Sequence, residues 1–172
     1  MKKEMAWNTS NVVADYVTSV EDGNDGEINI TKKFYHDPFF FSLVPKIARQ
    51  ATILDLACGN GYMGTILKRR SPEVNIVGLD TELMTMNGWQ TNVGSEKNKN
   101  IFAVAGHAQE LPFKDESFDY VLSSLLYHWA DKAEQITAEL YRTMKSDSEA
   151  IISLANPRFF KTDFHVSFSG HR

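Results

Sequence analysis

Short apolar segments alternate with amphipathic segments along most of this sequence, and this alternation restricts the fold more than any other feature. The apolar segments have strand length and those between them have helical spacing, which indicates βαβ units. We expect strands at 52–57, 75–79, 101–105, 118–123 and 150–154, and helices at 61–70, 83–92 and 133–145. Parallel strands joined by helices are covered on both faces, so the pattern predicts an α/β fold with a doubly wound, mainly parallel sheet.

The sequence before the first expected strand predicts a helical part. Apolar residues recur at helical spacing from Val12 to Val20, and Asp37-Pro38 is a favourable helix start that predicts a second helix through 39–49. The length of 172 residues fits one domain. We therefore expect a single domain over 1–172, with a helical part at 1–50, a ligand-binding core at 51–155 and a short C-terminal part at 156–172.

Composition and charge exclude several classes of protein. Eighteen basic against 22 acidic residues give a net charge of −4, which disfavours nucleic acid as a partner. The single cysteine, Cys58, cannot form an internal disulfide. No apolar stretch approaches the roughly 20 residues that a membrane span needs. We therefore expect a cytoplasmic protein without a membrane span.

Glycines and an acid follow the first two expected strands. The turn 58–61 (CGNG) follows the first strand, and Asp80 closes the second, 19 residues after Gly61. Parallel sheets bind ligands at the carboxyl ends of their strands. Glycines permit a close approach of the backbone, and the N–H groups of the next helix favour a carboxylate or phosphate. An acid at this spacing can accept both hydroxyls of a ribose, so the pattern predicts a site for an adenosine-containing cofactor.

Two cofactor classes compete for this site. Residues 59–64 match the dinucleotide fingerprint G-x-G-x-x-G, which on its own is weak evidence for NAD. Asp55, four residues before Gly59, would place negative charge close to a pyrophosphate, and no second βαβ half follows to hold a nicotinamide. A sulfonium cofactor that carries an ammonium group suits that acid better. The residues favour such a cofactor, with an NAD-dependent reductase as the alternative.

Three segments resemble the motifs of class I S-adenosylmethionine-dependent methyltransferases. Residues 53–61 (ILDLACGNG) resemble their first motif, 76–80 (IVGLD) followed by Met84 the second, and 106–119 (GHAQELPFKDESFD) the stretch between the third and fourth strands. The run LPFKDESFD is especially typical of the branch that methylates quinones, sterols and natural products. The resemblance implies a Rossmann-like fold, S-adenosyl-L-methionine as cofactor, S-adenosyl-L-homocysteine as product and a small-molecule acceptor. The N-terminal part resembles, more loosely, the lid helices of that branch.

The resemblance also implies the cofactor-binding residues. Asp55 and the turn after it would hold the methionine end and Asp80 the ribose, and the alternatives are a loop tie and a helix cap. The complete set is Tyr16, Asp55, Ala57, Cys58, Gly59, Gly61, Asp80, Thr81, Met84, His107, Ala108 and Ser124. His107 stands where the family usually has an acid, and its imidazole can accept a hydrogen bond from adenine only when neutral. No residue pattern indicates a metal site.

The segment 125–131 (LLYHWAD) follows the fourth expected strand and supplies the candidate for catalysis. His128 could act as a general base, with a structural role as the alternative. Aromatic residues outside the sheet pattern predict a small, largely apolar or aromatic acceptor, unless they only form core between the N-terminal helices. They are Trp7, Tyr16, Phe34, Tyr35 and Phe39 to Phe41.

The resemblance implies a helix and two antiparallel strands after the fifth strand, and here the sequence departs from it. Residues 156–172 contain one alternating run, 164–168 (FHVSF). We expect either one replacement edge strand or the start of a region lost by truncation, and an uncovered edge would pair with a second copy or a partner chain. The second case allows an alternative function, that of a cofactor-binding but inactive subunit of a methyltransferase complex.

Overall fold

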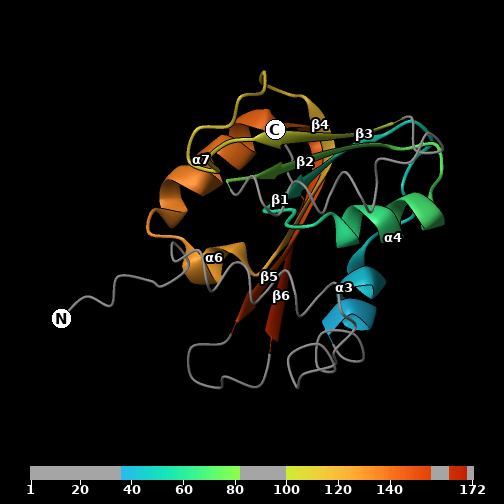
Figure 1. Cartoon of the computed structure of the whole chain (residues 1–172), viewed down its shortest axis with the longest axis horizontal. Helices are drawn as coiled ribbons and strands as arrows, with labels where there is room; N and C mark the ends of the chain where they lie inside the picture. Colours follow the sequence, from blue (N-terminus) through green and yellow to red (C-terminus); the bar gives the residue numbers. More distant parts are fainter. Residues whose placement is uncertain (1–35, 82–99, 156–162, 170–172) are drawn as a thin grey trace. The chain divides into compact units, whose positions relative to one another are not determined.

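The computed structural model describes residues 36–81, 100–155 and 163–169, and the chain divides into two compact units, Met1–Ser42 and Leu43–Arg172 (Figure 1). Helix α3 (Asp37–Leu43) begins where Asp37-Pro38 predicts a start. The ring of His36 stacks on Phe40 at 5.6 Å, and its Nδ1 lies 2.8 Å from the carboxylate of Asp37. The helix ends at Leu43 and not at residue 49 as predicted, because Pro45 disfavours helix at the residue before it.

The second unit is built around one six-stranded sheet, in which the strands follow the order β3-β2-β1-β4-β5-β6. The first five strands are parallel and β6 is antiparallel to β5. The strands are β1 (Thr52–Leu56), β2 (Asn75–Asp80), β3 (Ile101–Ala105), β4 (Phe118–Ser124), β5 (Met144–Ala155) and β6 (Asp163–Ser169). Figure 1 shows how strongly the sheet twists from β3 to β6. The predicted doubly wound, mainly parallel sheet is confirmed, and the run 164–168 lies within the antiparallel strand β6.

Three helices of this unit are described: α4 (Tyr62–Arg70), α6 (Leu126–Trp129) and α7 (Ala133–Thr143). The chain moves from β1 toward β3 through α4 and from β4 toward β6 through α7. Because crossovers are right-handed, these two helices cover opposite faces of the sheet. Leu54 and Leu56 share a buried core with Ile136 and Leu140 of α7. None of the helices within the described ranges is long and apolar enough to cross a bilayer.

The junction between α7 and β5 corrects the prediction of a helix over 133–145. The helix ends at Thr143 and β5 begins at once with Met144, six residues before the predicted start. The N–H groups of Glu116 and Ser117 donate to the last carbonyls of the helix, those of Arg142 (3.0 Å) and Thr143 (2.7 Å). These bonds from a distant loop satisfy carbonyl groups at the helix end that would otherwise lack a partner. The periodicity of the sequence cannot predict them. The expected helices at 12–20 and 83–92 lie outside the described residues.

Candidate functional site

The carboxyl end of β1 turns sharply back onto β2. Ala57 (φ 62°), Gly59 (φ 52°) and Gly61 (φ 81°) all have left-handed backbones. The N–H groups of Ala57 and Cys58 both donate to the carbonyl of Leu79, at 2.8 and 3.1 Å. These bonds fix the start of the turn against the end of the neighbouring strand, which is why β1 ends at Leu56, one residue before the predicted end.

The turn and the acid at the end of β2 form one structure. The N–H of Gly59 donates to Oδ2 of Asp80 at 2.8 Å, in a partly buried position. A carboxylate offers about four acceptor positions, so this bond is compatible with further hydrogen bonds to a ligand. The sequence spacing between glycine turn and acid therefore becomes direct contact in the fold. Asp80 is the half-buried last residue of β2.

A second acid lies beneath the turn. Asp55 is buried within β1, with 2% of its surface exposed, and Cys58 is 6% exposed. Burial, followed by the negative charges of Asp55 and then Asp80, raises the pKa of the Cys58 thiol far above its ordinary value. The thiol is therefore neutral near pH 7 and unsuited to act as a nucleophile. Its Sγ lies 3.8 Å from the carbonyl of Gly59, within the turn itself.

Space opens above the turn where α4 begins. A Cβ added to Gly59 would meet no protein atom within 4 Å. Gly61 is the N-cap residue of α4, so no N-cap side chain occupies the start of this helix. Oδ1 of the buried Asn60 accepts the N–H of Tyr62 at 3.3 Å. The backbone at the start of a helix favours an anion. Open space beside a left-handed glycine whose N–H is bonded to Asp80 fits a ligand that combines a carboxylate with hydroxyl groups.

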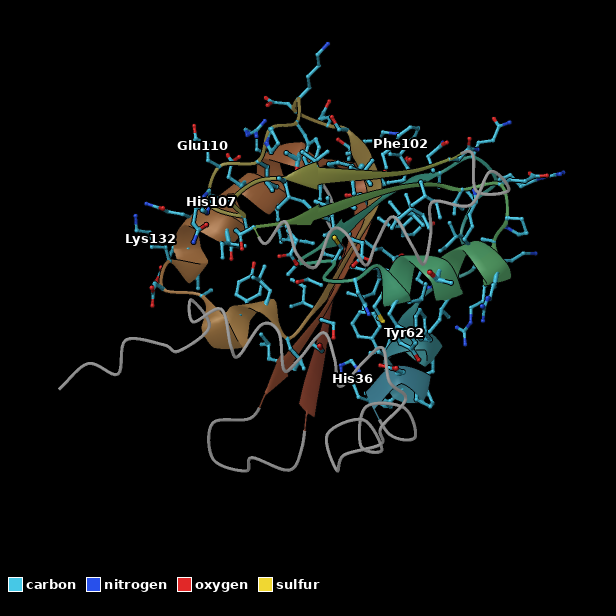
Figure 2. All side chains as sticks on the ribbon, viewed as in Figure 1. His36, Tyr62, Phe102, His107, Glu110 and Lys132 are labelled. Carbon is cyan, nitrogen blue, oxygen red and sulfur yellow. The ribbon has the colours of Figure 1, made fainter. Side chains whose placement is uncertain are left out.

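The loop after β3 lies beside the same strand end. The N–H of Gly106 donates to the carbonyl of Asp80 at 3.0 Å, which connects the ends of β2 and β3. His107 is exposed and forms an isolated bridge with Glu110, and Figure 2 shows both beyond the end of β3. Ala108 is buried, with 7% exposed. His107 therefore lies in the expected loop with an accessible ring.

The carboxyl end of β4 supplies the fourth part of this site. Ser124 is the last residue of β4, and Leu125 after it has a left-handed backbone with φ 64°. His128 lies in the short helix α6, and its side chain is outside the described part. The Oη of Tyr127 lies 3.1 Å from Oγ1 of Thr137, and burial raises the pKa of Tyr127, so its hydroxyl is protonated near neutral pH.

The structure thus brings most of the predicted residues to one edge of the sheet. Contacts join Ala57, Cys58, Gly59 and Asp80 directly, with Asp55 beneath them. Thr81 follows Asp80 and is exposed. Tyr16 and Met84 lie outside the described residues. No cluster that could hold a metal ion occurs among the residues the structure describes.

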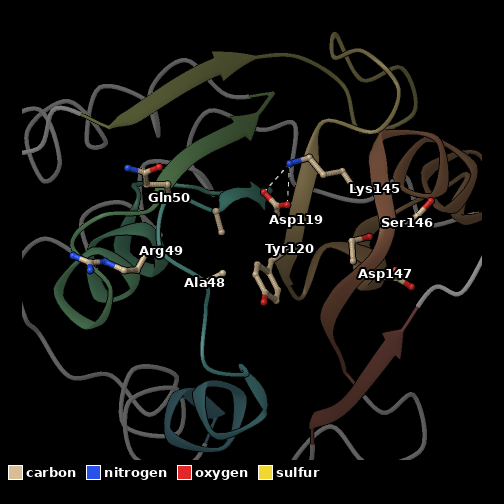
Figure 3. Close-up of a pocket in the computed structure, with 10 residues that line it drawn as sticks. Ala48, Arg49, Gln50, Asp119, Tyr120, Lys145, Ser146 and Asp147 are labelled. Carbon is tan, nitrogen blue, oxygen red and sulfur yellow. Dashed lines mark hydrogen bonds and ion pairs between the residues drawn. The ribbon is translucent and has the colours of Figure 1, made fainter.

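The hollow in Figure 3 lies at the opposite end of the sheet, near the starts of β1, β4 and β5. It has a volume of about 310 Å³ and a mostly polar lining. Asp119 accepts hydrogen bonds there from Nζ of Lys145, at 2.8 and 2.9 Å, and from the N–H of Thr52 at 2.8 Å. These bonds connect the starts of three strands, so the last acid of the LPFKDESFD run stabilises the sheet.

A second structural contact that sequence reasoning missed holds the first part of the same run. Arg142 on α7 donates to the carbonyls of Leu111 (3.0 Å) and Phe113 (2.8 Å) and to the carboxylates of Asp115 (2.8 Å) and Glu139 (2.7 Å). Glu139 also accepts the N–H of Leu111 at 2.8 Å. The Glu139–Arg142 spacing on a helix was the only sequence signal for this clamp.

Comparisons with known proteins agree with this geometry. The model of the methyltransferase domain family matches residues 54–152, more than half of the chain. The chain therefore belongs to this family, within the class I S-adenosylmethionine-dependent methyltransferases, and S-adenosylmethionine is the cofactor of that class.

Individual relatives are similar over most of this chain. Demethylmenaquinone methyltransferase of Lactobacillus johnsonii is 31% identical over 130 residues, which cover 74% of this chain and 52% of the relative. Malonyl-[acyl-carrier protein] O-methyltransferase 1 of Coxiella burnetii is 27% identical over 121 residues, which cover 70% and 39%. The crystal structure of an S-adenosylmethionine-dependent methyltransferase from Mesorhizobium loti has a TM-score of 0.63 at 19% identity, with 70% of this chain and 52% of that chain covered. The chain spans about half the length of the first and third of these proteins and 39% of the second.

Proposed function

We propose that this chain transfers a methyl group from S-adenosylmethionine to a small, largely apolar acceptor. The observation that carries the proposal is the hydrogen bond from the Gly59 N–H to Asp80, which joins the glycine turn and the acid into one site. The open space beside Gly59 supports it, because a ligand there could approach the backbone closely.

Each part of the edge has a proposed task toward the cofactor. The buried charge of Asp55 attracts the ammonium group, directly or through a water molecule, and the N–H groups near Gly61 favour the carboxylate. Asp80 accepts the ribose hydroxyls, with Thr81 beside them. The loop at His107 and Ala108 faces the adenine, and the backbone of Ser124 borders the reacting end. Tyr16 and Met84 complete the proposed set.

The protein's part in the reaction is positioning and proton transfer. When bound, S-adenosylmethionine supplies an electrophilic methyl group on a sulfonium centre. The chain orients the acceptor in line, excludes water and removes a proton where the acceptor carries one. His128, in the helix directly after β4, is the proposed base, because a neutral imidazole accepts a proton near pH 7.

Three observations support a small acceptor. One relative is named for demethylmenaquinone, a quinone, and the run 111–119 is typical of methylases of such molecules. The net charge of −4 disfavours a polyanion. Methyl incorporation from labelled S-adenosylmethionine into hydroxylated quinones and aromatics, compared with tRNA, tests this choice. Labelling of tRNA that falls steeply between about 50 and 200 mM salt would contradict it.

Calorimetry with S-adenosylhomocysteine tests the cofactor site. Asp80→Asn keeps an oxygen that can accept the Gly59 N–H but loses the charge, so affinity should fall roughly tenfold or more. Gly61→Val should abolish binding by blocking the backbone approach. The exposed acid Glu73 provides the matched control Glu73→Gln, which should bind as wild type does. Binding of NADH without binding of S-adenosylhomocysteine would instead establish the reductase alternative.

Pairing of the β6 edge with a second copy or a partner chain stays a prediction. Strand β6 is the last strand of the described sheet, so one of its sides faces no further described strand. Light scattering of the purified protein would show a dimer if this edge pairs with a second copy.

A further inference from the structure

The chain leaves β4 through a turn that needs support. Leu125 has φ 64° and ψ 7°, a left-handed conformation that is unfavourable for any residue with a Cβ. No side chain caps the short helix that follows. Such a conformation persists only where the surrounding structure holds it, and residues of this kind cluster at functional sites.

Ser153 on β5 provides that support from the neighbouring strand. The N–H of Leu125 donates to both the carbonyl and the Oγ of Ser153, at 3.2 and 3.0 Å. Ser153 is paired with Ser124 in the register of β4 and β5 and has no exposed surface. On the other side of β4, Oγ of Ser123 donates to the carbonyl of Leu56 at 3.1 Å. The end of β4 is therefore fixed to the strands on both of its sides.

We propose that Ser153 is a positioning residue of the cofactor site: its hydroxyl holds Leu125 left-handed and thereby fixes the Ser124 backbone and the direction of α6. This inference rests on the proposed function, in which the Ser124 backbone borders the cofactor. Without the hydroxyl, the Leu125 N–H keeps only its longer bond, to the carbonyl. The turn then populates other conformations, and only the fraction with Leu125 left-handed binds the cofactor, so the apparent affinity falls.

The test compares Ser153→Ala in two backgrounds. In the wild-type background, affinity for S-adenosylhomocysteine should fall about threefold to tenfold, the usual effect of one lost hydrogen bond. In a Leu125→Gly background the left-handed turn needs no support, so Ser153→Ala should change affinity less than about twofold. Hydrogen exchange at the Leu125 amide should be faster in the single variant Ser153→Ala than in the wild-type protein. Ser148→Ala is the matched control, since Ser148 is a buried serine of the same strand near its other end.

The outcomes separate this inference from the proposed function. Unchanged affinity in Ser153→Ala, or equal losses in both backgrounds, would overturn the positioning role while leaving the cofactor site intact. Wild-type protein that binds no S-adenosylhomocysteine would refute the proposed function, and the cofactor-positioning role with it. In that case, faster exchange of the Leu125 amide would identify Ser153 as a support of the fold alone. A loss in Ser148→Ala as large as in Ser153→Ala would also overturn the inference, because the effect would be general to β5.

Discussion

Replacing Gly59 by alanine separates the stability of the turn from its proposed role in binding. Gly59 has φ 52°, and a Cβ there would touch no protein atom within 4 Å. The cost to folding is therefore conformational and not steric: about 1–2 kcal/mol for a left-handed alanine. The lower entropy of the unfolded chain offsets about 0.4–1 kcal/mol of this. The net loss should be about 1 kcal/mol, or roughly 2–4 °C in Tm for a chain of this size.

The effect on cofactor binding should be larger than the effect on folding. If the cofactor approaches the backbone at Gly59, the new methyl group occupies its space, and overpacking of about 1–3 kcal/mol predicts at least a roughly fivefold loss of affinity. Gly59→Asn is the control for strain, because asparagine tolerates the left-handed region but still carries a Cβ. It should cost less stability and as much affinity for S-adenosylhomocysteine. Calorimetry and thermal unfolding measure the two quantities, and wild-type affinity in Gly59→Ala would refute the assignment of this space to the cofactor.

Three further predictions concern neighbouring groups. Because burial raises the Cys58 pKa, the folded state holds a proton that the unfolded thiol releases above about pH 8.5. The free energy of unfolding should therefore fall with pH above that value, by up to about 1.4 kcal/mol per pH unit. Cys58→Ala should remove this pH dependence from the denaturation profile. Arg142→Ala should lower Tm and speed hydrogen exchange at the Leu111 amide, since Arg142 fixes both that loop and the Glu139 acceptor; unchanged exchange would refute the clamp. His107→Asp should raise affinity for S-adenosylhomocysteine, because a carboxylate accepts from the adenine amino group at any neutral pH; equal or weaker binding would show that this side chain does not face adenine.

The sheet could be predicted from the sequence because its signals are local. Apolar runs such as 75–79 and 101–105 have strand length and turn-forming boundaries, and both became strands with those starts. The glycine turn and Asp80 also have a local signal, since only residue type and spacing matter there. Prediction failed where hydrogen bonds from distant residues determine the end of an element. The amide of Ser117 binds the carbonyl of Thr143, where α7 ends, and the periodicity of 133–145 contains no information about a residue 26 positions earlier.

The backbone geometry of the site explains why the glycine fingerprint describes it only in part. Two non-glycine residues, Ala57 and Leu125, also adopt left-handed conformations, at the ends of β1 and β4. These strands are the neighbours from which the sheet winds in both directions, the place where such folds bind ligands. Each strained amide is held by the end of an adjacent strand, Ala57 by Leu79 and Leu125 by Ser153. The shape of this site therefore depends on bonds between strands as well as on glycine, so removing the Ser153 hydroxyl, which touches no ligand, should still alter binding.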